Sequence, residues 1–150
     1  MTMAMYFSLV IECYREVDAF RIKEGLESLV LCLDDRRVPM ANLDLYTKSD
    51  FWYVTACPVG PGYSNFGFGE GMNEPAMVAR IIDELYLSLT GENGIRRALC
   101  GYEVHDVFED ERGEAVLNRF DFSDLIYHRD AAEPQPGAQE FGREFYRNLA

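Results

Sequence analysis

Residues 5–33 read MYFSLVIECYREVDAFRIKEGLESLVLCL, and this stretch decides the predicted fold because one hydrophobic period replaces another within it. From Met5 to Tyr14, apolar residues fill every second position, which predicts a strand with one buried face. After Asp18, a candidate helix cap, apolar residues recur at three- and four-residue steps as far as Leu33. We therefore expect a strand followed by an amphipathic helix, with Gly25 allowing close packing against the sheet.

The next segments continue the alternation of strands and helices. Residues 43–57 predict a hairpin of two strands, residues 73–91 a second helix, and residues 95–108 a fourth strand. This order predicts a single-domain α+β protein, a two-layer sandwich with ferredoxin-like βαββαβ order. A differently ordered sheet built from the same elements remains an alternative.

The C-terminal part adds to this arrangement. Residues 115–122 predict an extra hairpin strand, and residues 139–149 predict a C-terminal helix on which Phe141 and Phe145 share a face. The predicted division is one α+β domain over residues 1–130, followed by a Pro-containing linker and helical segment over residues 131–150.

Acidic residues dominate the charge of the chain. The 150 residues include 26 Asp and Glu against 14 Lys and Arg, a net charge of −12. Residues 103–130 hold nine carboxylates and three arginines, a net charge of −6, which is half of the total. Such a field repels nucleic acid and anionic membranes, and it attracts basic proteins.

The N-terminus and the cysteines indicate a cytoplasmic protein. The N-terminal apolar run lacks a preceding basic region and ends at Glu12, unlike a signal peptide. The four cysteines form no CxxC pair and lie in apolar stretches, so we expect four reduced, buried thiols: Cys13, Cys32, Cys57 and Cys100. Twelve arginines against two lysines suggest a GC-rich bacterial genome.

A glycine-rich loop spans residues 58–72, between a predicted strand and a predicted helix. Its glycines at 67, 69 and 71 do not have the spacing of a dinucleotide-binding turn, and the lysine of a P-loop is missing. The loop is either a plain connection or a contact surface. Its large apolar side chains are the candidate partner contacts Tyr63, Phe66 and Phe68.

His105 is the one candidate for acid–base chemistry. On a strand, Glu103 and His105 point to the same side, and a carboxylate beside an imidazole can orient it and raise its pKa. The alternative is an ordinary polar position on a half-exposed strand. The sequence lacks HxH, HExxH and Cys/His clusters, so it predicts neither a metal site nor a cofactor.

The clustered charge favours a non-enzymatic acidic protein that caps a basic protein partner. The most specific form of this hypothesis is an immunity protein or antitoxin that neutralises a bacterial toxin. The alternative is a small enzyme or small-molecule-binding domain that uses the open sheet face around His105. A homodimer is a further option, through the C-terminal segment. The predicted partner-binding carboxylates are Glu103, Asp106, Glu109, Asp110, Glu111 and Glu114.

Overall fold

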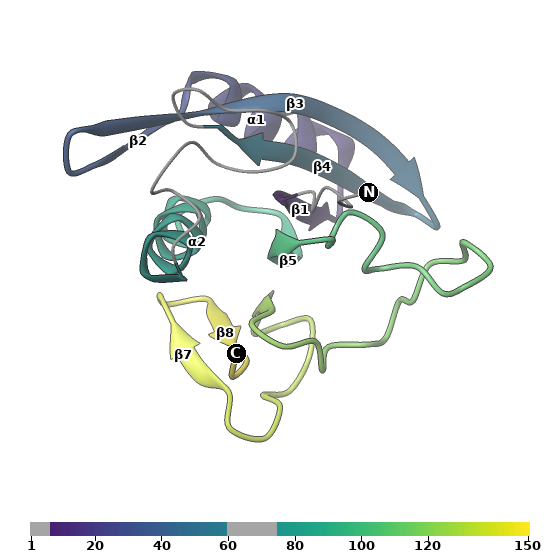
Figure 1. The fold of residues 1–150 in the computed structure, drawn as a ribbon. Coiled ribbons are helices and arrows are strands. Elements are labelled where there is room, and N and C mark those ends of the chain that lie inside the picture. The colour runs from purple at the N-terminus through teal and green to yellow at the C-terminus, as the bar shows by residue number, and fades with distance from the viewer. Residues whose placement is uncertain (1–6, 60–74) are drawn as a thin grey trace, which may run out of the picture.

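Within the residues that the computed structural model describes, 7–59 and 75–150, eight strands form one antiparallel sheet accompanied by two helices (Figure 1). The strands lie in the order β2-β3-β4-β1-β5-β6-β8-β7, so the first strand of the chain is near the centre. The helices are α1 (Glu16–Ser28) and α2 (Pro75–Leu89). The strands are β1 (Phe7–Cys13), β2 (Val30–Leu33), β3 (Arg36–Lys48), β4 (Phe51–Pro58), β5 (Ile95–Tyr102), β6 (Ile126–His128), β7 (Gln139–Phe141) and β8 (Phe145–Arg147).

The predicted ferredoxin-like βαββαβ sandwich is wrong, because the sheet has eight strands and includes two segments predicted to be helical. Residues 30–33 form β2, and the predicted C-terminal helix is replaced by β7 and β8, which a turn at Gly142 (φ 64°) connects. The predicted extra hairpin strand at residues 115–122 contributes one isolated bridge, between Ala115 and Glu109. Apolar residues three or four apart in a short run fit a strand as well as a helix.

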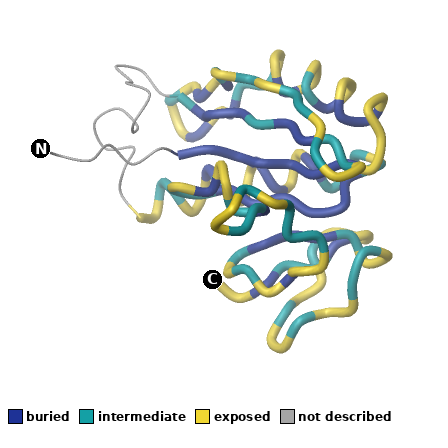
Figure 2. The backbone as a smooth tube through the Cα atoms, turned by 90° about the vertical axis from the view of Figure 1, so that its right-hand side faces the viewer, coloured by how far each residue is buried: buried dark blue, intermediate teal, exposed yellow. Residues whose placement is uncertain are grey.

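Both helices pack on one face of the sheet. The alternate residues Phe7, Leu9 and Ile11 of β1 join the apolar stripes of α1 and α2 in one core. All seven residues of β1 are buried, because the opposite face is covered as well (Figure 2). The helical residues of this core are Ala19, Ile22, Leu26, Ile81, Leu85, Tyr86 and Leu89.

The opposite face of the sheet is covered by residues 103–125, the long connection between β5 and β6, which we call the covering segment. Its residues Phe108 and Phe120 are buried in a second core with Val10 of β1 and Tyr53 of β4. Most of the predicted acidic surface therefore lies on a segment that is folded against the sheet.

The start of α1 depends on Asp18, although not as the predicted cap. The N-cap residue is Arg15, whose side chain makes no capping hydrogen bond. Asp18 is buried and accepts hydrogen bonds from Arg15 (3.0 Å) and Arg21 (2.8 Å). Its carboxylate lies against Gly94, where a Cβ atom would come within 2.3 Å of it.

Three of the four cysteines are buried as expected. Cys13, Cys57 and Cys100 lie in the interior, and burial together with nearby Asp18 raises the pKa of the Cys13 thiol to about 12. Cys32 is exposed on β2, contrary to the prediction. In the described part of the chain, neither helix has the length and apolar character needed to cross a membrane.

Candidate functional site

Two arginines and one glutamate form a buried cluster beneath the covering segment. Glu12 of β1 accepts hydrogen bonds from Arg96 (2.7 Å) and from the Nε and Nη2 atoms of Arg97 (2.8 and 3.0 Å). The side chains of Glu12 and Arg97 are both 0% exposed. The strand register shifts beside Glu12, which pairs with Arg97 while Cys13 pairs with Ile95. This bulge lets two consecutive arginines reach the same carboxylate.

The cluster also binds the main chain of the covering segment. Arg97 donates hydrogen bonds to the carbonyl oxygens of Val116 (2.6 Å) and Arg119, and Arg96 donates one to that of Leu117 (2.5 Å). The guanidinium of Arg97 also lies 4.1 Å from the ring centroid of Phe108. A segment with little secondary structure is thus fixed to the sheet by charged donors.

Tyr53 completes the cluster from β4. Its hydroxyl donates a hydrogen bond to Glu12 (2.7 Å), and its ring stacks on Tyr46 at 5.2 Å between centroids. Burial and the neighbouring carboxylate raise the pKa of Tyr53, so the phenol stays protonated and remains a donor. Because its hydrogen bonds link β1, β4 and β5 to the covering segment, we infer that this cluster helps to hold the fold together.

Beyond the buried cluster, residues 109–115 form a tight turn that we call the acidic hairpin. The N–H of Asp110 donates to the carbonyl of Glu114 (2.7 Å), and the Asp110 carboxylate accepts from the N–H groups of Arg112 (2.8 Å) and Glu114 (3.0 Å). These backbone hydrogen bonds, from Glu114 first, hold the pKa of Asp110 below its usual value. Lys48 at the end of β3 pairs with Glu109 at 3.1 Å and donates to the carbonyl of Gly113.

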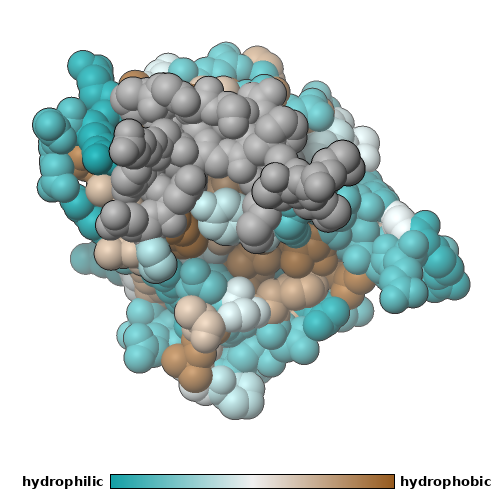
Figure 3. All heavy atoms as spheres, viewed as in Figure 1, coloured by the Kyte–Doolittle hydropathy of each residue, from teal (hydrophilic) through white to brown (hydrophobic). Residues whose placement is uncertain are grey.

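The predicted partner-binding carboxylates have different environments. The side chains of Asp106 and Glu114 are 77% and 68% exposed, and Glu111 is exposed as well. The green stretch of chain that projects at the right of Figure 1 is hydrophilic in the space-filling view of Figure 3. Glu109 and Asp110 are partly buried and stabilise the hairpin itself. Glu103, Asp106, Glu111 and Glu114 are therefore the exposed members of the predicted set.

The predicted strand that would place Glu103 and His105 on one face ends before both residues. β5 ends at Tyr102, and Glu103 has a φ of 55°, so the chain turns before His105. His105 is 43% exposed and lies 3.3 Å from Asp106. His105 does not line the hollow between α2 and the C-terminal strands that is described next.

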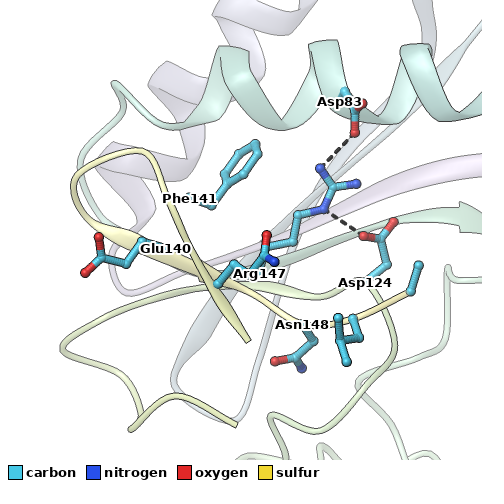
Figure 4. A pocket seen from close by; sticks show the side chains of 9 residues that line it. Asp83, Asp124, Glu140, Phe141, Arg147 and Asn148 are labelled. Atoms are coloured by element: carbon cyan, nitrogen blue, oxygen red, sulfur yellow. Dashed lines mark hydrogen bonds and ion pairs between the residues drawn. The ribbon is translucent and has the colours of Figure 1, made fainter. Parts of the chain in front are cut away.

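A hollow of about 450 Å³ lies between α2 and the C-terminal strands (Figure 4). Arg147 of β8 is placed there between Asp83 of α2 (2.8 Å) and Asp124 of the covering segment (2.7 Å). Its guanidinium also lies over the rings of Tyr86 and Phe141. Because Arg147 links β8 to both α2 and the covering segment, we interpret this group as a structural tie.

The buried cluster was not predicted, although the sequence contains a signal for it. Glu12 and the pair Arg96-Arg97 interrupt otherwise apolar strands, and opposite charges inside two such strands indicate a buried ion pair. In the described residues, no three His, Cys, Asp or Glu side chains are placed to hold a metal ion. The candidate contacts Tyr63, Phe66 and Phe68 lie outside the described residues.

Comparison with protein-family models, with curated proteins and with solved structures finds no match to this chain.

Proposed function

We propose that this protein is a non-enzymatic acidic binding protein that caps a basic protein partner through the covering segment. The observation that supports the proposal is the attachment of the covering segment, which includes the acidic hairpin, to the sheet. Exposed carboxylates at Asp106, Glu111 and Glu114 are displayed on a segment that Arg96 and Arg97 bind to the sheet.

A fixed acidic surface favours binding in two ways. The net charge of −6 over residues 103–130 steers a basic protein toward this side and increases the association rate. Because the hairpin is already ordered, less conformational entropy is lost when the partner binds.

The most specific form of the proposal is an immunity protein or antitoxin for a bacterial toxin. A toxin that acts on nucleic acid must present Lys and Arg to phosphate groups, and an acidic protein can occupy that surface. Under this proposal the partner is toxic when expressed alone, and co-expression of this chain restores growth.

The test compares two variants with equal net charge. One replaces three exposed carboxylates of the covering segment: Asp106→Asn, Glu111→Gln and Glu114→Gln. The control replaces three exposed carboxylates elsewhere: Asp35→Asn, Glu133→Gln and Glu140→Gln. Glu109 and Asp110 are kept, because they stabilise the hairpin.

The partner is first captured from an extract of the source organism and identified, and its association rate is then measured at about 50 mM and about 500 mM salt. We expect the covering-segment variant to associate about tenfold or more slowly at low salt, and the control variant to change little. Equal association rates for both variants, or a captured partner without basic character, would refute the proposal.

A further inference from the structure

A small apolar groove lies between α1 and α2, on the side of the sheet opposite the covering segment. Its volume is about 190 Å³. Its apolar lining comes from Ile22, Leu26 and Leu29 on one side and Leu89 on the other.

Gly25 forms part of the wall of this groove, and packing does not explain its presence. A glycine inside a helix lowers helix stability relative to alanine. A Cβ atom at residue 25 would meet nothing within 4 Å, so the predicted close packing of Gly25 against the sheet is wrong. The effect of the missing side chain is to leave the groove open.

We propose that this groove binds one apolar side chain of a partner segment that also carries Lys or Arg. The groove is smaller than the roughly 300–1,000 Å³ typical of small-molecule sites, so it suits a single side chain of about leucine size. Apolar side chains that fill such hollows are common anchors of protein interfaces.

The charge around the groove selects a basic segment. Glu24 precedes Gly25 and is exposed, and Glu84 lies one helical turn before Ser88, which lines the groove. Glu92 lines it directly and pairs with Arg21 at 3.3 Å.

A second copy of this chain is a poorer occupant. At a two-fold interface the same carboxylates would face one another, and each copy has a net charge of −12. Binding at the groove is independent of the proposed function. The groove lies on the other face of the sheet, and none of the carboxylates of the covering segment takes part in it.

The test uses the full chain labelled at its Ile and Leu methyl groups, and three short synthetic peptides as probes. The first peptide has one leucine flanked by lysines, the second has serine in place of the leucine, and the third has glutamates in place of the lysines. We expect the first peptide to shift the methyl signals of Leu26, Leu29 and Leu89 saturably, and to bind about tenfold or more tightly than the others.

Gly25→Leu should fill the groove and abolish these shifts, whereas Ser28→Leu, a control at an exposed position of the same helix, should leave them unchanged. If Gly25→Leu does not fold, Glu24→Gln with Glu84→Gln should weaken the first peptide selectively. The proposal is overturned if the three methyl groups do not respond, or if the glutamate peptide binds equally well. It is also overturned if sedimentation shows a dimer of the chain that Gly25→Leu dissociates, because a second copy then occupies the groove.

Discussion

Replacing Glu12 with glutamine should lower the free energy of unfolding by about 3–5 kcal/mol, the usual cost of removing one partner from a buried ion pair. The substitution keeps the size of the side chain and removes its charge. Four donor atoms now meet the carboxylate: one from Arg96, two from Arg97 and the hydroxyl of Tyr53. In the variant, two buried guanidinium groups would lack their counter-charge.

The loss is large compared with a typical stability of about 5–15 kcal/mol, and for a chain of this size it corresponds to a decrease in Tm of about 6–20 °C. Urea unfolding can be followed by the fluorescence of Trp52, the one tryptophan of the sequence. We expect a lower midpoint with an unchanged slope. Hydrogen exchange should increase first in residues 116–120, because the carbonyl groups of Val116, Leu117 and Arg119 accept hydrogen bonds from the two arginines.

The control is Asp121→Asn, which breaks an exposed ion pair with Arg119. It should leave the urea midpoint nearly unchanged, because exposed ion pairs contribute little to stability. If Glu12→Gln also costs less than about 1 kcal/mol, the cluster does not hold the covering segment, and the reasoning is wrong.

The other predictions concern α1. Gly25→Ala should raise the free energy of unfolding by about 1 kcal/mol in urea titrations, because a helix-interior glycine is replaced and the added Cβ meets nothing. Gly94→Ala should lower Tm by several degrees, because the added Cβ would collide with Asp18 and Gly94 has a φ of +85°. Burial disfavours the ionised form of Asp18, but hydrogen bonds from Arg15 and Arg21 outweigh it and hold its pKa below the usual 3.8. Ionised Asp18 therefore stabilises the fold above about pH 4, and urea midpoints of the wild type and Asp18→Asn should converge as the pH falls below 4.

Each of these three predictions has an outcome that would contradict it. A destabilising Gly25→Ala would show that residue 25 is crowded in solution, and the open groove would lose its support. An unchanged Tm for Gly94→Ala would mean that Asp18 moves aside at no cost. A gap between wild type and Asp18→Asn that stays constant down to pH 2 would show that the Asp18 pKa is not lowered.

The sequence predicted individual elements better than their assembly. Alternation identified β1, and the hairpin at residues 43–57 corresponds to the paired β3 and β4. Residues 30–33 were ambiguous because four apolar residues in a row carry no period. The helix predicted over residues 139–149 was wrong because Phe141 and Phe145, which are four residues apart, lie on either side of a turn. The turn pairs them across β7 and β8.

The candidate site was predicted only in part. Charge counting located the acidic segment, since exposed carboxylates are visible in composition. It could not show that Glu109 pairs with Lys48, because Lys48 is distant in sequence. Glu12 and Arg97 likewise meet only through strand pairing.

The arginines beneath the covering segment bind main-chain oxygens, and every amino acid supplies that oxygen. The side chains at Val116, Leu117 and Arg119 can therefore be exchanged during evolution without loss of these bonds. The attachment by Arg96 and Arg97 therefore tolerates changes of side chain in this part of the covering segment. A lineage could therefore change the side chains at these positions while its scaffold stayed the same.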